Sequence, residues 1–180
     1  MKKFSFLLVM ILVLTGCNLA LNNTPTKKVE MFLANYQTLN EDVMNDLSNV
    51  VMSEDKLNDS QKEKYTSLMK RHYQALNYDI KDEKIDGDEA IVTTQITVYD
   101  YTKEKSKANV YKEEHLNEFK TNDKYDESLF NDYLLDKLSR VTDTVTYTIN
   151  FTLHKGDDGN WKLDALTKEQ EQKIHGIYLY

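Results

Sequence analysis

The stretch "DTVTYTINFTLHKGDDGNWKLDAL" (residues 143–166) decides the fold, because it has the clearest alternation of apolar and polar residues in the chain. The alternating apolar positions are Val145, Tyr147, Ile149, Phe151 and Leu153. A period of two turns one set of side chains toward a core and the other toward solvent. The glycine-containing segment "KGDDGN" then predicts a turn into a shorter strand, on which Trp161 and Leu163 share a face.

A second segment with the same period precedes it in the chain. In "GDEAIVTTQITVYD" (residues 87–100) one face has Ala90, Val92, Thr94, Ile96 and Val98. The Asp86-Gly87 pair predicts a turn between this strand and an extended run over residues 78–85. The run before the turn alternates less regularly than the run after it. We therefore predict a second antiparallel hairpin.

Helical patterns come before the strands. Thr24 and Pro25 favour a helix start, Asn40 opens a second short helix, and Ser60 with Glu63 predicts a capping box for a third. The third helix has one apolar stripe: Tyr65, Leu68, Met69, His72, Tyr73 and Leu76. Thr167 and Gln170 can cap a closing helix that contains Ile174 and Ile177.

Residues 103–140 interrupt the strands. The first half of this segment is highly charged and weakly periodic, whereas the second half predicts an amphipathic helix containing Phe130, Tyr133 and Leu134. We interpret the segment as a helical excursion, in the position of a flap over one end of the sheet. Helices followed by antiparallel strands indicate an α+β fold, with helices packed on one face of a curved sheet, and residues 25–180 are expected to form one domain.

The first seventeen residues, "MKKFSFLLVMILVLTGC", predict where in the cell the protein is located. Two lysines precede an apolar run that is well short of the ~20 residues a membrane-spanning helix requires, which predicts a signal peptide over residues 1–16. "LTGC" resembles the lipobox of bacterial lipoproteins. That resemblance implies cleavage before Cys17, lipid on its sulfur, and a short tether over residues 17–24. The alternative is an ordinary secretory leader with an incidental cysteine.

Composition excludes several classes of function. The formal net charge is −7 and there is no basic stripe, so nucleic acid is not an expected partner. The single cysteine and four scattered histidines do not have the spacing of zinc ligands. The acidic turns lack the spaced carboxylates of a calcium-binding loop. We therefore expect no metal and no cofactor. A disulfide within the chain is impossible.

Two segments resemble a known fold family. "GDEAIVTTQITVYD" and "FTLHKGDDGNWKLDAL" (residues 151–166) are similar to strands of NTF2-like proteins, and together with the helices before them they suggest a bacterial lipoprotein with an NTF2-like domain. The resemblance implies a cone, in which a bent sheet wraps against helices around a cavity. The family includes enzymes and non-catalytic binding modules, so the fold alone does not give the function.

Enzymes of this family often pair an aspartate with a histidine in the cavity. By this resemblance His72 is a candidate acid/base residue, with Asp100 or Asp164 as its partner; the alternative is a partly buried structural histidine. Tyrosines combine apolar area with a hydroxyl, which suits a recognition surface; the alternative, that they pack at the margins of the core, is the interpretation we favour. The candidate cavity-lining residues are His72, Tyr65, Tyr73, Tyr99 and Tyr133.

The sequence thus predicts a lipid-anchored binding or protein-interaction module on the extracytoplasmic face of the cell membrane, without catalytic activity. Its expected partners are the membrane, through Cys17, and a protein or small hydrophobic ligand. Two alternatives remain open: a surface enzyme centred on His72, and an immunity or accessory lipoprotein.

Overall fold

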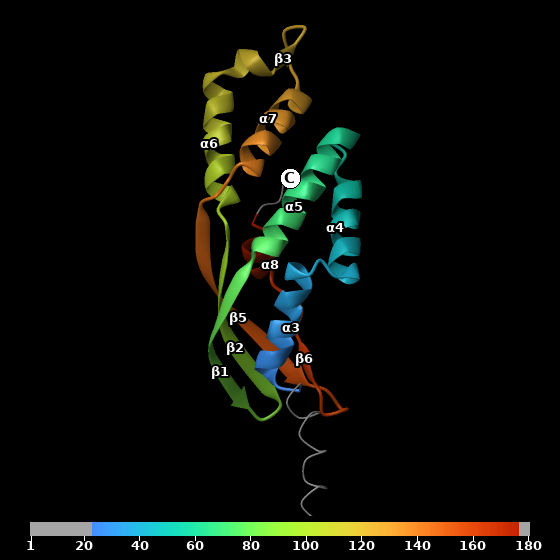
Figure 1. The fold of residues 1–180 in the computed structure, drawn as a ribbon, viewed down its shortest axis with the longest axis vertical. Helices are drawn as coiled ribbons and strands as arrows, with labels where there is room; N and C mark the ends of the chain where they lie inside the picture. Colours follow the sequence, from blue (N-terminus) through green and yellow to red (C-terminus); the bar gives the residue numbers. More distant parts are fainter. Residues whose placement is uncertain (1–22, 177–180) are drawn as a thin grey trace, which may run out of the picture.

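The computed structural model describes residues 23–176 and is built on a four-stranded antiparallel sheet in the order β1-β2-β5-β6 (Figure 1). The strands are β1 (Asn77–Asp86), β2 (Glu89–Tyr99), β5 (Thr144–Lys155) and β6 (Trp161–Leu163). Both predicted hairpins are therefore present. The α+β class is confirmed, whereas the predicted signal peptide and Cys17 lie outside the described residues, as does Ile177.

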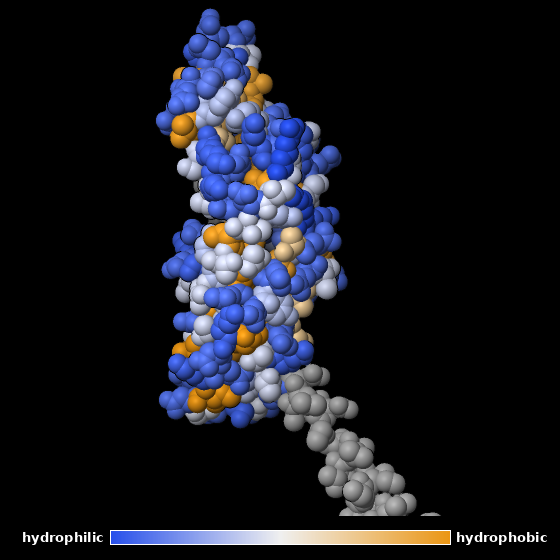
Figure 2. Space-filling view, turned by 60° about the vertical axis from the view of Figure 1, so that its left-hand side comes forward, coloured by the Kyte–Doolittle hydropathy of each residue, from blue (hydrophilic) through white to orange (hydrophobic). Residues whose placement is uncertain are grey.

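The two long central strands pair without a break in register. The β2–β5 pairing runs from Glu89 opposite His154 to Tyr99 opposite Thr144. Alternate residues are buried, among them Val92 and its cross-strand partner Phe151. The opposite face is polar: the hydroxyls of Thr97 and Thr146 lie 2.9 Å apart. Figure 2 shows that this side of the molecule is mostly hydrophilic, with apolar residues in small separate spots.

Three helices precede the sheet: α3 (Pro25–Gln37), α4 (Glu41–Ser53) and α5 (Asp59–Ala75). Thr24 and Asn40 cap α3 and α4 as predicted. The predicted capping box of α5 was wrong. Asn58 is the N-cap, and its side chain accepts from the backbone of Gln61, whose own side chain accepts from the backbone of Asn58. The helix begins earlier because this pair satisfies two free backbone donors.

The excursion between β2 and β5 is longer than predicted at its start. It contains α6 (Tyr101–Glu114), the 3₁₀ turn η1 (Leu116–Phe119), the small hairpin of β3 (Lys120–Thr121) and β4 (Lys124–Tyr125), and α7 (Glu127–Ser139). Residues of α6 gave little periodic signal because only Tyr101 and Ala108 are buried in it. α6 packs on α7, and α7 packs on α5.

The apolar interior forms two clusters. We call the first the sheet core; it consists of Val29, Leu33, Leu76, Ala90, Val92, Ile96, Val98, Ile149, Phe151, Leu153, Trp161 and Ile174. We call the second the helical core; it consists of Leu47, Val51, Leu57, Tyr65, Leu68, Met69, Tyr73, Tyr101, Ala108, Phe119, Phe130, Leu134, Leu135, Leu138 and Val141. The closing helix α8 (Lys168–His175), capped by Thr167 and Gln170 as predicted, contributes Ile174 to the sheet core.

The two cores lie at opposite ends of an elongated molecule, with α5 and α8 near the middle (Figure 1). Within residues 23–176, every helix is too short or too polar to span a bilayer.

Candidate functional site

A pocket of about 330 Å³ lies where α3, α4, α5 and α8 meet. Its volume is within the range of small-molecule sites, which begin at roughly 300 Å³. All four helices contribute lining residues, as does the loop between β6 and α8. The lining residues are Tyr36, Val43, Asp46, Leu47, Val50, Tyr65, Met69, Tyr73, Leu166, Glu171 and His175.

Helical spacing explains how single helices supply several lining residues. Tyr65, Met69 and Tyr73 are four residues apart on α5, so their side chains lie above one another on one face. Val43 and Leu47 have the same spacing on α4. The stripe that the sequence assigned to core packing therefore also forms the pocket floor.

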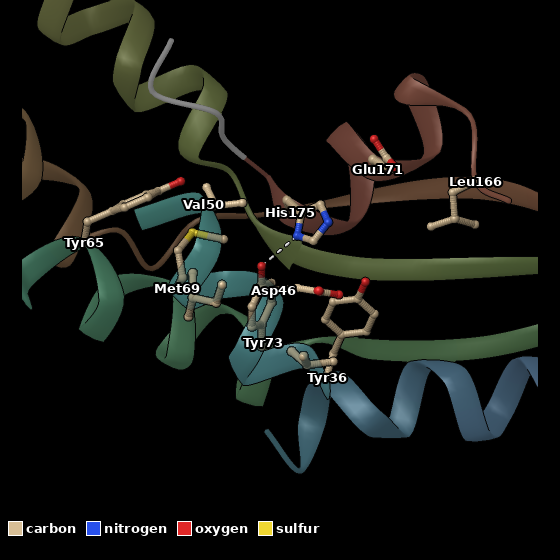
Figure 3. Close-up of a pocket in the computed structure, with 11 residues that line it drawn as sticks. Tyr36, Asp46, Val50, Tyr65, Met69, Tyr73, Leu166, Glu171 and His175 are labelled. Atoms are coloured by element: carbon tan, nitrogen blue, oxygen red, sulfur yellow. Dashed lines mark hydrogen bonds between the residues drawn. The ribbon is translucent and has the colours of Figure 1, made fainter. Parts of the chain in front are cut away.

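Three aromatic rings meet at the centre of the pocket. The hydroxyl of Tyr73 and Nδ1 of His175 lie 2.7 Å apart and share a hydrogen bond, which Figure 3 marks with a dashed line. The ring centroid of Tyr36 lies 5.1 Å from that of Tyr73 and 5.7 Å from that of His175, both in edge-to-face geometry. These contacts join α3, α5 and the last turn of α8 at one point.

Burial and charge shift the pKa of two of these groups. Burial, followed by the nearby His72, lowers the pKa of His175 to about 4, so its ring is neutral at neutral pH. Burial, followed by the negative charges of Asp46 and Glu171, raises the pKa of Tyr36 to about 12. The pocket therefore combines neutral aromatic rings with two carboxylates.

His72 lies beneath the pocket rather than among its lining residues. Its side chain is fully buried, and Nε2 lies 2.9 Å from the carbonyl oxygen of Ile174. Because a carbonyl can only accept, Nε2 carries the proton and donates. Nδ1 is buried without a hydrogen-bond partner among the described residues. Burial accordingly lowers the pKa of His72 to about 4.

The carboxylates suggested as partners for His72 are used elsewhere. Asp164 lies 2.5 Å from Nδ1 of His154, on the polar side of the sheet, and Asp100 caps the start of α6. His72 instead points toward α8, because its position on the α5 stripe turns it toward the interior. An acid/base pair between His72 and Asp100 or Asp164 is therefore not formed in this structure.

The other tyrosines named as candidates divide between two places. Tyr65 and Tyr73 line the pocket. The guanidinium of Arg71 lies over the ring of Tyr99, at 4.2 Å from its centroid, and Tyr133 stacks on Tyr111 at the margin of the helical core. Neither Tyr99 nor Tyr133 is a lining residue of the pocket.

Sequence reasoning missed two central residues of the site. Neither Tyr36 nor His175 is among the candidate cavity-lining residues that the sequence suggested. A signal for His175 did exist: the capping residues Thr167 and Gln170 predict a helix, and on that helix His175 adjoins the apolar Ile174.

A second, more open groove lies between α5 and α7. Most of its lining residues are polar or charged, among them Glu63, Lys64, Arg71 and Asp136. Arg71 donates to the carbonyl oxygens of Ser139 and Val141, so its guanidinium is engaged in holding the end of α7. We regard the aromatic pocket as the better candidate site, because it combines apolar walls with converging polar groups.

Across residues 23–176, no three His, Cys, Asp or Glu side chains converge closely enough to hold a metal ion.

No protein-family model matches the chain, and no curated protein matches it. Among solved structures, a "putative lipoprotein (ycdA)" from Bacillus subtilis is similar, with 16% sequence identity and a TM-score of 0.39. The match covers 66% of this chain and 38% of that chain. This similarity is too distant to carry an argument, and the site must be interpreted from its own geometry.

Proposed function

We propose that this protein is a lipid-anchored, extracytoplasmic binding module without catalytic activity, which takes a small molecule into the pocket between α3, α4, α5 and α8. The observation that carries the proposal is the convergence of Tyr36, Tyr73 and His175 on a pocket of about 330 Å³. Rigid aromatic walls with a few polar groups are typical of ligand sites.

The sequence supports the lipid anchor. A basic start, a short apolar run and "LTGC" occur in the order of a lipoprotein leader, and two acyl chains are sufficient for stable membrane attachment. Helix α3 begins at the end of the molecule opposite the β3–β4 hairpin (Figure 1). A lipid on Cys17 would thus hold the sheet end near the bilayer and direct the helical end away from it.

We also propose that the fold is a variant of the NTF2-like cone. The order of three helices followed by a four-stranded antiparallel sheet supports this assignment. The variant differs from the simple pattern in two respects: a helical excursion separates β2 from β5, and the aromatic pocket is lined by helices and the β6–α8 loop.

The anchor is tested with Cys17→Ala, expressed as the full chain in a bacterium that processes lipoproteins. We expect the variant to move from the membrane fraction to the soluble fraction, and the neighbouring Asn18→Ala to remain in the membrane. Unchanged membrane partitioning of Cys17→Ala would contradict the anchor.

The pocket is tested with Val50→Trp, which fills it, and with Val110→Trp as a control at an exposed site on α6. Saturation-transfer NMR with a library of neutral and charged fragments would report binding to the full chain in non-ionic detergent. We expect a set of fragments whose binding is lost in Val50→Trp and retained in Val110→Trp. If every fragment binds both variants equally, the pocket is not a ligand site.

A further inference from the structure

We infer that the aromatic pocket selects an organic ammonium ion. This inference rests on the proposed binding function and names the chemical class of its ligand. Three observations carry it: the arrangement of the rings, the sign of the charges around them, and the size of the cavity.

The rings are arranged as partial walls rather than as a stack. Tyr36, Tyr73 and His175 contact one another edge to face, with centroid separations between 5.1 and 5.7 Å. Such an arrangement leaves ring faces turned in different directions. The face of a tyrosine ring attracts a cation placed within about 6 Å of its centroid. Tyr65 adds a further ring to the lining.

The charges that border these rings are negative. Asp46 on α4 and Glu171 on α8 both line the pocket, and in Figure 3 the carboxylate of Asp46 lies beside the ring of Tyr36. Burial is the main cause of the raised pKa of Tyr36, and the negative charges of Asp46 and Glu171 raise it further. The pocket lining includes no lysine or arginine among the described residues, and His175 is neutral.

This charge pattern disfavours other classes of ligand. An anion would enter against two carboxylates with no cationic side chain in the lining to receive it. A bare metal ion would need three or more converging ligands, and the described residues offer no such group. A small organic cation suits both the carboxylates and the aromatic rings of the pocket, because its charge faces Asp46 and Glu171 while its carbon atoms contact the tyrosines.

The test compares choline with 3,3-dimethylbutan-1-ol, which has the same shape and no charge. Each is titrated by saturation-transfer NMR into the full chain in non-ionic detergent. We expect choline to bind about tenfold more tightly than the alcohol, the difference that cation–π and carboxylate contacts can supply. Ethanolamine in a parallel titration shows whether the methyl groups or the N–H groups of the ammonium are preferred.

The double variant Asp46→Asn/Glu171→Gln keeps the shape of the pocket and removes its charge. We expect it to reduce choline binding several-fold and to leave binding of the alcohol unchanged. The matched control is Asp55→Asn/Glu113→Gln, which removes the same charge at two exposed positions outside the pocket.

The outcomes separate this inference from the proposed function. If the alcohol binds as tightly as choline and Val50→Trp abolishes both, the pocket is a site for neutral ligands; the ammonium inference is then overturned and the binding function stands. If no ligand in these titrations or in the fragment library responds to Val50→Trp, both are overturned.

Discussion

The two cores of this molecule are built from different side chains. The sheet core is mainly aliphatic; its buried aromatic residues are Phe151 and Trp161. The helical core buries Tyr65, Tyr73 and Tyr101 together with two phenylalanines, and further tyrosines pack at its margin. Aliphatic side chains fill space without polar requirements, whereas each buried tyrosine hydroxyl needs a partner.

The difference explains where the candidate site lies. Tyr36 packs against both cores, and Tyr73 of the helical core finds its hydroxyl partner in His175 of α8. The pocket forms at the boundary between the two cores. There, a buried tyrosine hydroxyl of the helical core bonds to a side chain of α8, the helix that also packs into the sheet core. The sheet core thus provides a scaffold, and its boundary with the helical core provides the polar groups of the pocket.

The largest effect is expected from Phe151→Ala. Phe151 is 0% exposed and lies opposite Val92 in the sheet core, so its loss leaves a cavity and should lower the free energy of unfolding by about 3–5 kcal/mol. Denaturant unfolding of the full chain measures this change.

In Phe130→Ala, made in the helical core, hydrogen exchange should rise in α6 and α7 while the strands stay protected. Equal loss of protection in β2 and β5 would mean that the cores unfold as one unit.

A smaller effect is expected on acidification, because His72 joins α5 to α8. The pKa of His72 is lowered from 6.5 to about 4 in the fold, so the unfolded chain binds more protons between these values. The contribution to stability is complete above pH 6.5 and is lost as the pH falls toward 4. It amounts to roughly 3 kcal/mol.

The pH effect is measured as the difference between wild type and His72→Gln in denaturant unfolding at several pH values. His154→Gln, at an exposed histidine, is the control. We expect the pH dependence to weaken in His72→Gln, with the part due to His175 remaining, and to persist in full in the control. Parallel curves for wild type and His72→Gln would show that folding does not lower the pKa of His72.

The next effect concerns the glycine that ends α8. Gly176 has φ +71°, and a Cβ there would lie 2.5 Å from Cε1 of the buried His72 ring. Gly159 has a similar φ of +74° with open space around it, which makes it a matched control for backbone strain alone. We expect Gly159→Ala to cost about 1 kcal/mol and Gly176→Ala about 1 kcal/mol more. Thermal unfolding of both variants measures the difference, and equal losses would argue against close packing of α8 on His72.

The smallest effect is expected from an ion pair on the surface of the helical core. Nζ of Lys64 on α5 lies 2.6 Å from Asp132 on α7, and this hydrogen bond lowers the pKa of the Asp132 carboxyl. Both side chains are about half exposed, so Lys64→Met should change the free energy of unfolding by less than about 1 kcal/mol, and less still at high salt. A larger loss in denaturant unfolding would mean that charge, rather than aromatic packing, joins α5 to α7.

Much of the fold could be predicted because local patterns encode which face of an element is buried. The alternation around Phe151 identified β5, and the apolar stripe through Met69 identified the buried face of α5. Predictions weakened where local signals compete. Asn58 and Ser60 both resemble an N-cap, and the actual start was decided by the reciprocal bonds of Asn58 with Gln61. Most of helix α6 falls within the predicted helical excursion, but its bounds could not be predicted because it buries too little surface to leave a periodic trace.

The candidate site was less predictable, because its residues are brought together across the chain. His72 and Ile174 are 102 positions apart, as are Tyr73 and His175. The sequence placed His72 and Tyr73 on an inward-facing stripe, and that was correct. It could not show that the partner element is α8, nor that Asp164 pairs with His154 across a hairpin.

Local patterns in the sequence were enough to predict the four strands of the main sheet, the inward face of α5 and the capped starts of α3, α4 and α8, together with the expectation of a lipid on Cys17. Periodicity and short motifs are local, so one chain of letters is enough to reveal them. Only the tertiary structure decided which faces meet, that two cores rather than one are formed, and that three aromatic rings and two carboxylates converge on one pocket. Such convergence depends on packing between distant segments, which no local pattern specifies.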